Sequence, residues 1–184
     1  MSINVAGHTF VFHQRDQQDG LGYDIVWEGK INAPALTHWG RGDKQLGDSP
    51  LPIELLNDSG APPSLNQQQA LEWLCSHLQE SVKRIQLACE KSWDEVYCCD
   101  GEEEMDDDVE YFIERIRIPP NTAPEWGQNQ QDPALPSLIV VDLEQDWEWE
   151  HGFYVVLDPS NPAGDFWSDW DGLNEAGLVR YDDA

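Results

Sequence analysis

A helical repeat of apolar residues between positions 64 and 96 places the strongest constraint on how this chain folds. The residues recur at spacings of three and four, which is typical of an amphipathic helix with one buried face. Ser64 and Gln67 have the form of a capping box at its start. The repeat predicts a single helix of about 30 residues that packs on a sheet. The apolar positions are Leu71, Leu74, Leu78, Val82, Ile85, Cys89, Trp93 and Val96.

Short β-rich segments lie on both sides of this helix. Residues 3–13 and 23–31 predict strands, and residues 51–56 predict an edge strand because Pro52 has no amide to donate. Residues 111–118 fit a strand or a helical turn, residues 135–157 a hairpin and residues 177–181 a short closing strand. The expected fold is α+β, a mainly antiparallel sheet packed on one long helix. It forms a single domain, 1–184, with residues 158–184 as a C-terminal elaboration.

Acidic and apolar residues alternate from Asp142 to Glu150, ahead of a β-rich run that resumes after Gly152. If this stretch is a strand, its period of two separates the two kinds of side chain onto opposite faces. We expect Trp147 and Trp149 to pack in the fold while the acids face outward; His151 has no assigned role. The acidic face would consist of Asp142, Glu144, Asp146, Glu148 and Glu150.

Negative charge dominates the chain: 36 Asp and Glu face only 10 Lys and Arg, for a formal net charge of −26. Such a surface repels nucleic acid and anionic lipid, and it accelerates encounter with a basic partner. Solubility alone, or adaptation to a salty habitat, would also account for the charge. No apolar run is long enough to span a bilayer and no secretory signal is visible, so we expect a cytoplasmic protein without membrane contact.

Three acidic tracts are candidates for partner contact: residues 100–110, 142–150 and 165–171, the last two with interleaved aromatic residues. Tryptophan supplies anchors in protein interfaces, and carboxylates supply steering and register. The predicted partner-binding residues are Glu103, Asp106, Asp107, Glu144, Asp146, Glu148, Glu150, Asp165, Trp167, Asp169, Trp170 and Asp171.

Signatures of catalysis are scarce in the sequence. The chain has no nucleophile elbow, phosphate-binding loop or zinc motif, and its four cysteines lack metal spacing and are expected to be reduced. Paired carboxylates could serve a glycosidase, with Glu148, Glu150, Asp169 and Asp171 as candidates beside tryptophan. Acids this abundant satisfy such a search by chance, so we expect no catalytic residue, no metal and no cofactor.

Residues 149–155, Trp-Glu-His-Gly-Phe-Tyr-Val, preceded by acids, resemble a motif of a broad bacterial family of small uncharacterised domains. Trp27-Glu28-Gly29 and the Gln-rich start of the long helix at Gln67 sit where that family has a Trp-bearing strand and a Gln-initiated helix. The resemblance covers about residues 20–160 and departs from the family after Leu157. Members are often immunity-like proteins, encoded beside secreted toxins, and the resemblance implies no catalytic residues.

These observations together favour a cytoplasmic, non-enzymatic immunity protein that binds and neutralises a basic bacterial toxin, for example one that acts on nucleic acid. An acidic domain with a housekeeping role is the alternative, and a carboxylate-dependent hydrolase ranks third. The sequence leaves the oligomeric state open.

Overall fold

The computed structural model describes residues 1–15, 25–37, 50–57, 59–96, 111–120, 134–145, 152–176 and 178. Their fold is α+β, with one eight-stranded sheet whose strands are ordered along the sheet as they are in the chain. The strands are β1 (Ser2–Val5), β2 (His8–Gln14), β3 (Ile25–Ile31), β4 (Leu51–Asn57), β5 (Tyr111–Ile118), β6 (Ile139–Gln145), β7 (Phe153–Leu157) and β8 (Phe166–Ser168). The helices are α1 (Pro34–Thr37), α2 (Leu65–Ser76), α3 (Leu78–Val96), the 3-10 turn η1 (Pro162–Gly164) and α4 (Trp170–Glu175).

Neighbouring strands are antiparallel except for β4 and β5, which pair in parallel. The parallel pairing follows from the connection between the two strands. The helices α2 and α3 return the chain to the end of the sheet at which β4 begins, and β5 starts from there. The prediction of an edge strand at residues 51–56 is therefore wrong, since β4 is internal. Pro52 faces Lys30 of β3 and lies beyond the ladder with β5, which pairs only with Ile53, Glu54 and Leu55.

Two helices replace the single long helix that the apolar repeat predicts. The break is at His77, which caps α2 with φ −125° and donates its amide to the Leu74 carbonyl. The carbonyl of His77 accepts the amide of Ser81 at 2.8 Å and so begins the hydrogen bonding of α3. Spacing alone did not reveal this break because α2 and α3 both turn apolar residues toward the same core. The capping box of Ser64 and Gln67 is confirmed.

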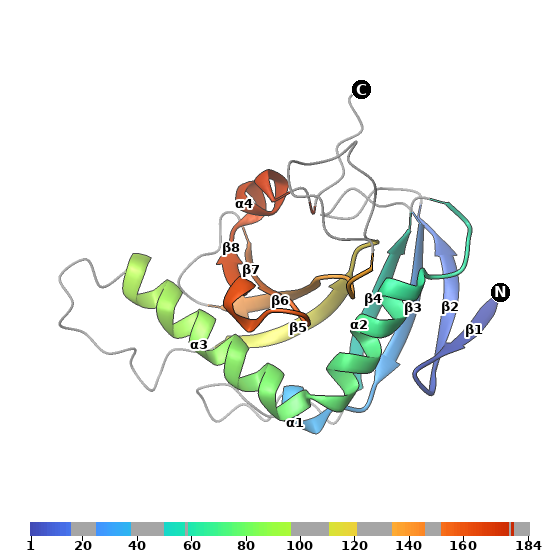
Figure 1. Cartoon of the computed structure of the whole chain (residues 1–184), viewed down its shortest axis with the longest axis horizontal. Coiled ribbons are helices and arrows are strands. Elements are labelled where there is room, and N and C mark those ends of the chain that lie inside the picture. Colours follow the sequence, from blue (N-terminus) through green and yellow to red (C-terminus); the bar gives the residue numbers. More distant parts are fainter. Residues whose placement is uncertain are drawn as a thin grey trace.

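The first face of the sheet, on which α2 and α3 lie, carries the larger core (Figure 1). Trp27, Phe10 and Phe153 are its largest buried side chains. Gly29 leaves room for the Phe10 ring on the paired strand, because a Cβ there would lie 2.7 Å from the ring. The stripe residues Leu71, Leu74, Val82, Ile85 and Cys89 all belong to this core.

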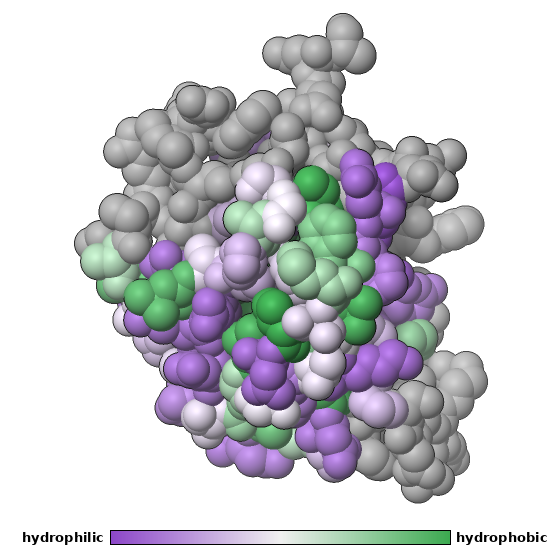
Figure 2. All heavy atoms as spheres, turned by 90° about the vertical axis from the view of Figure 1, so that its right-hand side faces the viewer, coloured by the Kyte–Doolittle hydropathy of each residue, from purple (hydrophilic) through white to green (hydrophobic). Residues whose placement is uncertain are grey.

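The second face of the sheet carries a smaller core and a row of charges. Its apolar part lies toward α4 and consists of Val26, Leu56, Val140, Val156, Leu173 and Leu178. Leu178 is buried there but is not in a strand; the rest of the predicted closing strand lies outside the described residues. On the side of β1, apolar surface forms a band bordered by hydrophilic residues (Figure 2).

The predicted hairpin is confirmed for β6 and β7, which pair from Ile139 with Leu157 to Leu143 with Phe153. The strand β6 ends at Gln145, and residues 146–151 lie outside the described residues. Leu143 packs in the first core as predicted. The prediction that the acids of this strand face outward is wrong for Asp142, which is 7% exposed and faces arginines. Glu144 is exposed.

Residues 111–118 form a strand rather than a helical turn. Of the four cysteines, Cys75 and Cys89 are free thiols on the helices, and Cys98 and Cys99 lie outside the described residues. In the described part of the chain, no helix has the length and apolarity to cross a membrane.

Candidate functional site

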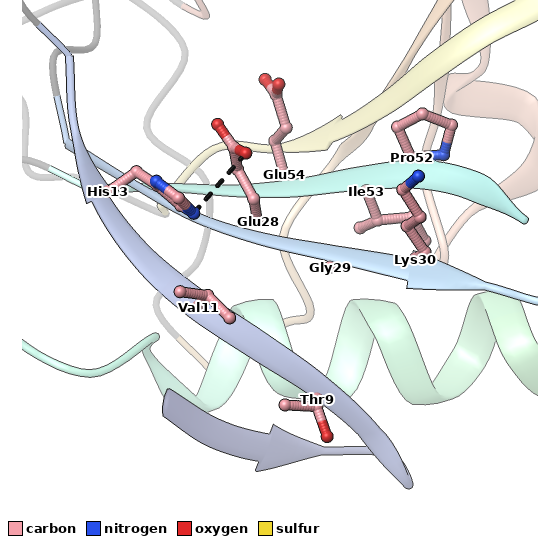
Figure 3. A pocket seen from close by; sticks show the side chains of 9 residues that line it. All are labelled: Thr9, Val11, His13, Glu28, Gly29, Lys30, Pro52, Ile53 and Glu54. Carbon is pink, nitrogen blue, oxygen red and sulfur yellow. Dashed lines mark ion pairs between the residues drawn. The ribbon is translucent and has the colours of Figure 1, made fainter. Parts of the chain in front are cut away.

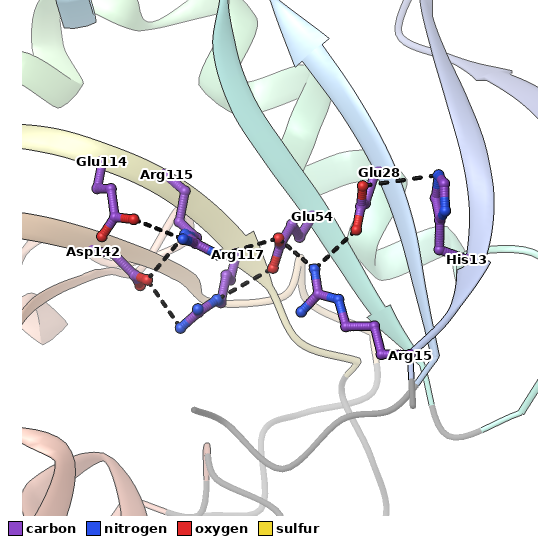
Figure 4. Close-up of polar contacts among 8 residues, drawn as sticks. All are labelled: His13, Arg15, Glu28, Glu54, Glu114, Arg115, Arg117 and Asp142. Carbon is purple, nitrogen blue, oxygen red and sulfur yellow. Dashed lines mark hydrogen bonds and ion pairs between the residues drawn. The ribbon is translucent and has the colours of Figure 1, made fainter. Parts of the chain in front are cut away.

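A row of charged side chains crosses the second face of the sheet from β2 to β6 (Figure 4). Strand alternation places them there: Glu54 stands between Ile53 and Leu55, and Arg117 between Ile116 and Ile118, whose side chains enter the first core. A charged residue between two such core residues therefore projects from the opposite face. The row consists of His13, Arg15, Glu28, Glu54, Glu114, Arg115, Arg117 and Asp142.

Glu54 lies at the centre of this row and is surrounded by three guanidinium groups. Its carboxylate accepts a 2.6 Å hydrogen bond from Arg15 Nη2 and a 3.3 Å hydrogen bond from Arg117 Nε. Arg115 Nη1 lies 3.5 Å away. Because Glu28 is its direct cross-strand neighbour, the two carboxylates would repel. Arg15 relieves the repulsion by bonding both, reaching Glu28 Oε1 at 3.0 Å.

Asp142 ends the row on β6. Its Oδ2 is 2.9 Å from Arg117 Nη1 and 3.8 Å from Arg115 Nε, whereas its buried Oδ1 has no hydrogen-bond partner among the described residues. Burial raises the pKa of the Asp142 carboxyl to about 7, because the loss of hydration outweighs the attraction of the two arginines. Tyr154, its cross-strand neighbour, has a raised pKa for the same primary reason, with the Asp142 charge adding to it.

A shallow hollow of about 440 Å³ opens on the second face over β2, β3 and β4 (Figure 3). Its polar side chains are Thr9, His13, Glu28, Lys30 and Glu54. His13 Nε2 lies 3.8 Å from Glu28 Oε2, and the other oxygen of Glu28 accepts from Arg15. Glu28 and Glu54 therefore both accept hydrogen bonds from the guanidinium group of Arg15.

A second concavity, of about 480 Å³, separates α3 from β8 and η1. We call it the α3–β8 groove. Its apolar lining consists of Leu87, Ala88, Pro162, Phe166 and Trp167. Ion pairs stand at both ends, Arg84 with Asp165 at one and Lys91 with Glu95 at the other.

Arg84 fastens the segment after β7 to α3. Its Nε donates to Asp165 Oδ2 at 2.6 Å, its Nη2 bonds Asp165 Oδ1, and Nη2 also donates to the Asp158 carbonyl at 2.8 Å. The guanidinium lies 4.9 Å from the centre of the Trp73 ring, within cation–π range. Asp165 in turn accepts the Asp158 amide at 2.8 Å, so one partly buried ion pair sets the path of the chain into β8.

The predicted partner residues of the 165–171 tract have structural contacts that the sequence did not indicate. Asp165 pairs with Arg84, Asp169 caps α4 by accepting the Gly172 amide at 2.9 Å, and Trp170 packs on the second core. Trp167 stacks on Phe153 at 5.9 Å and bonds Glu95. Asp171 is exposed. Asp165 and Trp167 come together in the α3–β8 groove.

The other predicted partner residues are only partly described. Glu144 is exposed on β6. Glu103, Asp106, Asp107, Asp146, Glu148 and Glu150 lie outside the described residues, as does His151. In the described ranges, no group of three or more His, Cys, Asp or Glu side chains is placed to hold a metal ion.

Sequence reasoning missed the charged row on the second face. A signal for it was present, because β4, β5 and β6 each carry isolated charges among branched apolar residues: Glu54, Arg117 and Asp142. Polar groups at such positions must find partners inside the protein.

Comparison of the chain with family models, with curated proteins and with solved structures finds no match in any of the three. The resemblance to the immunity-like bacterial family therefore stays a prediction.

Proposed function

We propose that this chain is a non-enzymatic binding protein that covers a basic protein partner, as a cytoplasmic immunity protein covers its toxin. The partner would approach an acidic surface and be held by carboxylates together with aromatic and aliphatic side chains. Residues Glu144 and Asp171 are the exposed acids of the predicted contact set within the described residues.

The observation that supports this proposal is that most of the few described cations pair with carboxylates of the same chain. Of the seven Lys and Arg residues in the described ranges, at least five pair with carboxylates of the same chain. All four described arginines, Arg15, Arg84, Arg115 and Arg117, are among them. They are at most 31% exposed.

Sequestered arginines offset little of the charge that a partner meets at the surface. With a formal net charge of −26, the chain presents a field that accelerates association with a cationic surface and opposes association with an anionic one. Tight covering of a basic, nucleic-acid-acting toxin is the task for which such a field is most useful.

The hydrolase alternative draws no support from Asp169 or Glu54. Asp169 is engaged as a helix cap, and Glu54 is surrounded by guanidinium groups.

The test is co-expression of the tagged chain with the product of the neighbouring reading frame, followed by measurement of the dissociation constant of the complex. We expect a complex whose affinity falls at least tenfold between about 0.05 M and 0.5 M salt. Glu144→Lys should weaken it severalfold. Glu72→Lys, which reverses an exposed charge on α2, is the matched control and should change the affinity little. Failure to form a complex would contradict the proposal.

A further inference from the structure

The α3–β8 groove exposes apolar surface on a helix face that is otherwise charged. Leu87 is 66% exposed and stands one helical turn from Lys83 on one side and from Lys91 on the other. Single exposed leucines are common on protein surfaces. Here, however, the apolar surface of Leu87 is contiguous with the rest of the groove lining, which is formed by Ala88, Pro162, Phe166 and Trp167.

We propose that this groove receives an apolar side chain of the basic partner, flanked in the partner's sequence by lysine or arginine. The inference rests on the proposed function and names the surface and the chemistry that anchor the partner. Anchors that fill a pocket and exclude water carry most of the binding energy in protein interfaces.

The walls of the groove are fixed before any partner binds. The partly buried Arg84–Asp165 pair holds the η1 side against α3. On the other side, Trp167 Nε1 donates to Glu95 Oε2 at 3.2 Å while its ring stacks on Phe153. A preformed concave surface loses little conformational freedom on binding, which favours affinity.

Of the four charged residues that line the groove, Arg84 pairs with Asp165 and Lys91 pairs with Glu95. The wider surroundings carry more acids than bases, which favours a cationic partner. Six acids belong to α3 and the adjoining residues 158–167, against three bases. Glu95 is half exposed beside the Trp167 indole, so a lysine or arginine next to the inserted apolar residue would meet a carboxylate. The acids are Glu80, Glu90, Asp94, Glu95, Asp158 and Asp165, and the bases are Lys83, Arg84 and Lys91.

From Arg84 to Glu95 the groove runs about 16 Å along α3, roughly three helical turns. An amphipathic helical segment of two to three turns fits this length and would present apolar residues to the groove at spacings of three and four. A lysine or arginine next to its apolar face would then lie within reach of Glu95, which is half exposed. We therefore take a basic amphipathic helix as the occupant.

The test uses a defined probe, a peptide of about four helical turns made only of leucine and lysine, with the leucines on one face. Its binding is followed in the amide NMR spectrum of the isotope-labelled protein, including the indole N–H of Trp167. The same spacing of leucine and glutamate gives a control peptide. Leu87→Gln removes the apolar surface, and Leu65→Gln is the matched control, because Leu65 is 67% exposed at the start of α2, away from the groove.

We expect the leucine–lysine peptide to shift the resonances of Leu87, Ala88 and Trp167, and the leucine–glutamate peptide to shift none of them. Leu87→Gln should weaken binding about tenfold, and Leu65→Gln less than twofold. Equal binding by both variants, or shifts confined to other surfaces, would overturn the groove as the anchor site. That outcome would leave the proposed function intact, because the salt dependence and the Glu144→Lys effect with the natural partner test the function separately.

Discussion

Asp142 on β6 directs one carboxylate oxygen at Arg117 on β5, 2.9 Å from its Nη1, while the other oxygen is buried without a hydrogen-bond partner among the described residues. The carboxyl is thus half satisfied in a site that is nearly closed to water. A buried polar atom without a partner costs free energy, and protonation of the carboxyl reduces that cost.

Stability should therefore depend on pH through Asp142. Its pKa is about 7 in the folded chain and about 3.9 in an unfolded one. At a pH between these two values the folded chain therefore holds a proton that the unfolded chain has released. The contribution of this group to the free energy of unfolding is then largest below pH 4 and is lost as the pH rises to about 7. Asp142→Asn does not titrate and should gain stability relative to the wild type over this window, by on the order of a few kcal/mol.

Urea unfolding between pH 4 and pH 8 measures this effect. Glu144→Gln, which removes an exposed carboxylate from the same strand, is the control and should follow the wild-type profile. If the free energy of unfolding of the wild type instead rises relative to that of Asp142→Asn as the pH rises, the attraction of the arginines exceeds the cost of burial. The expected role of Asp142 would then be wrong.

The Arg84–Asp165 pair should be among the most costly interactions to break. Arg84→Met leaves the Asp165 carboxylate and the Asp158 carbonyl without their guanidinium partner, at a cost of about 3 kcal/mol in the free energy of unfolding. Lys83→Met, at an exposed neighbouring position of α3, should change stability by less than about 0.5 kcal/mol. Chemical denaturation of the two variants decides the point, and equal stabilities would refute the role of Arg84.

Gly29 should not tolerate a side chain. In Gly29→Ala the new methyl group would lie 2.7 Å from the Phe10 ring, which is fully buried and cannot move without disturbing the core. We expect a loss of about 1–3 kcal/mol of stability from this overpacking. At Gly60 the nearest atoms are 3.8 Å away on Phe12, so Gly60→Ala should be neutral or slightly stabilising by thermal denaturation. A harmless Gly29→Ala would mean that β2 and β3 pack differently.

Gln67 joins α2 to two strands and should matter more than its neighbour Gln68. Its Nε2 donates to the carbonyls of Leu56 and Ile118 at 2.7 Å and 2.8 Å, where burial leaves no water to replace it. Gln67→Ala should cost about 2–3 kcal/mol of stability. Gln68→Ala, which loses a 2.9 Å bond to the Pro63 carbonyl in a less buried position, should cost less than about 1 kcal/mol. Equilibrium unfolding of both variants tests this, and a reversed order would contradict it.

The sequence predicted most elements of this fold because their periodicity is local. The helical stripe, the β6–β7 hairpin and the N-terminal strands were all visible in it. The break at His77 was not, because the apolar spacing continues through it. The internal position of β4 depends on the parallel pairing with β5, which no local pattern encodes.

The candidate site was harder to predict than the fold, because charge alone does not say which acids have internal partners. Asp165 looked like part of an acidic surface, yet it is bound to Arg84, which lies 81 residues earlier in the chain. Asp142 looked like the first residue of an outward acidic face, yet it lies between Arg115 and Arg117 of the neighbouring strand. Partners so distant in sequence come together only through the tertiary fold.

With its arginines sequestered in ion pairs, the chain should present an acidic surface that attracts the proposed basic partner. The most direct measurement is the association rate constant of the chain with the product of the neighbouring reading frame, as a function of ionic strength. We expect this rate constant to fall at least tenfold between about 0.05 M and 0.5 M salt, because the screening length shortens over that range. A rate constant that is independent of salt would contradict it.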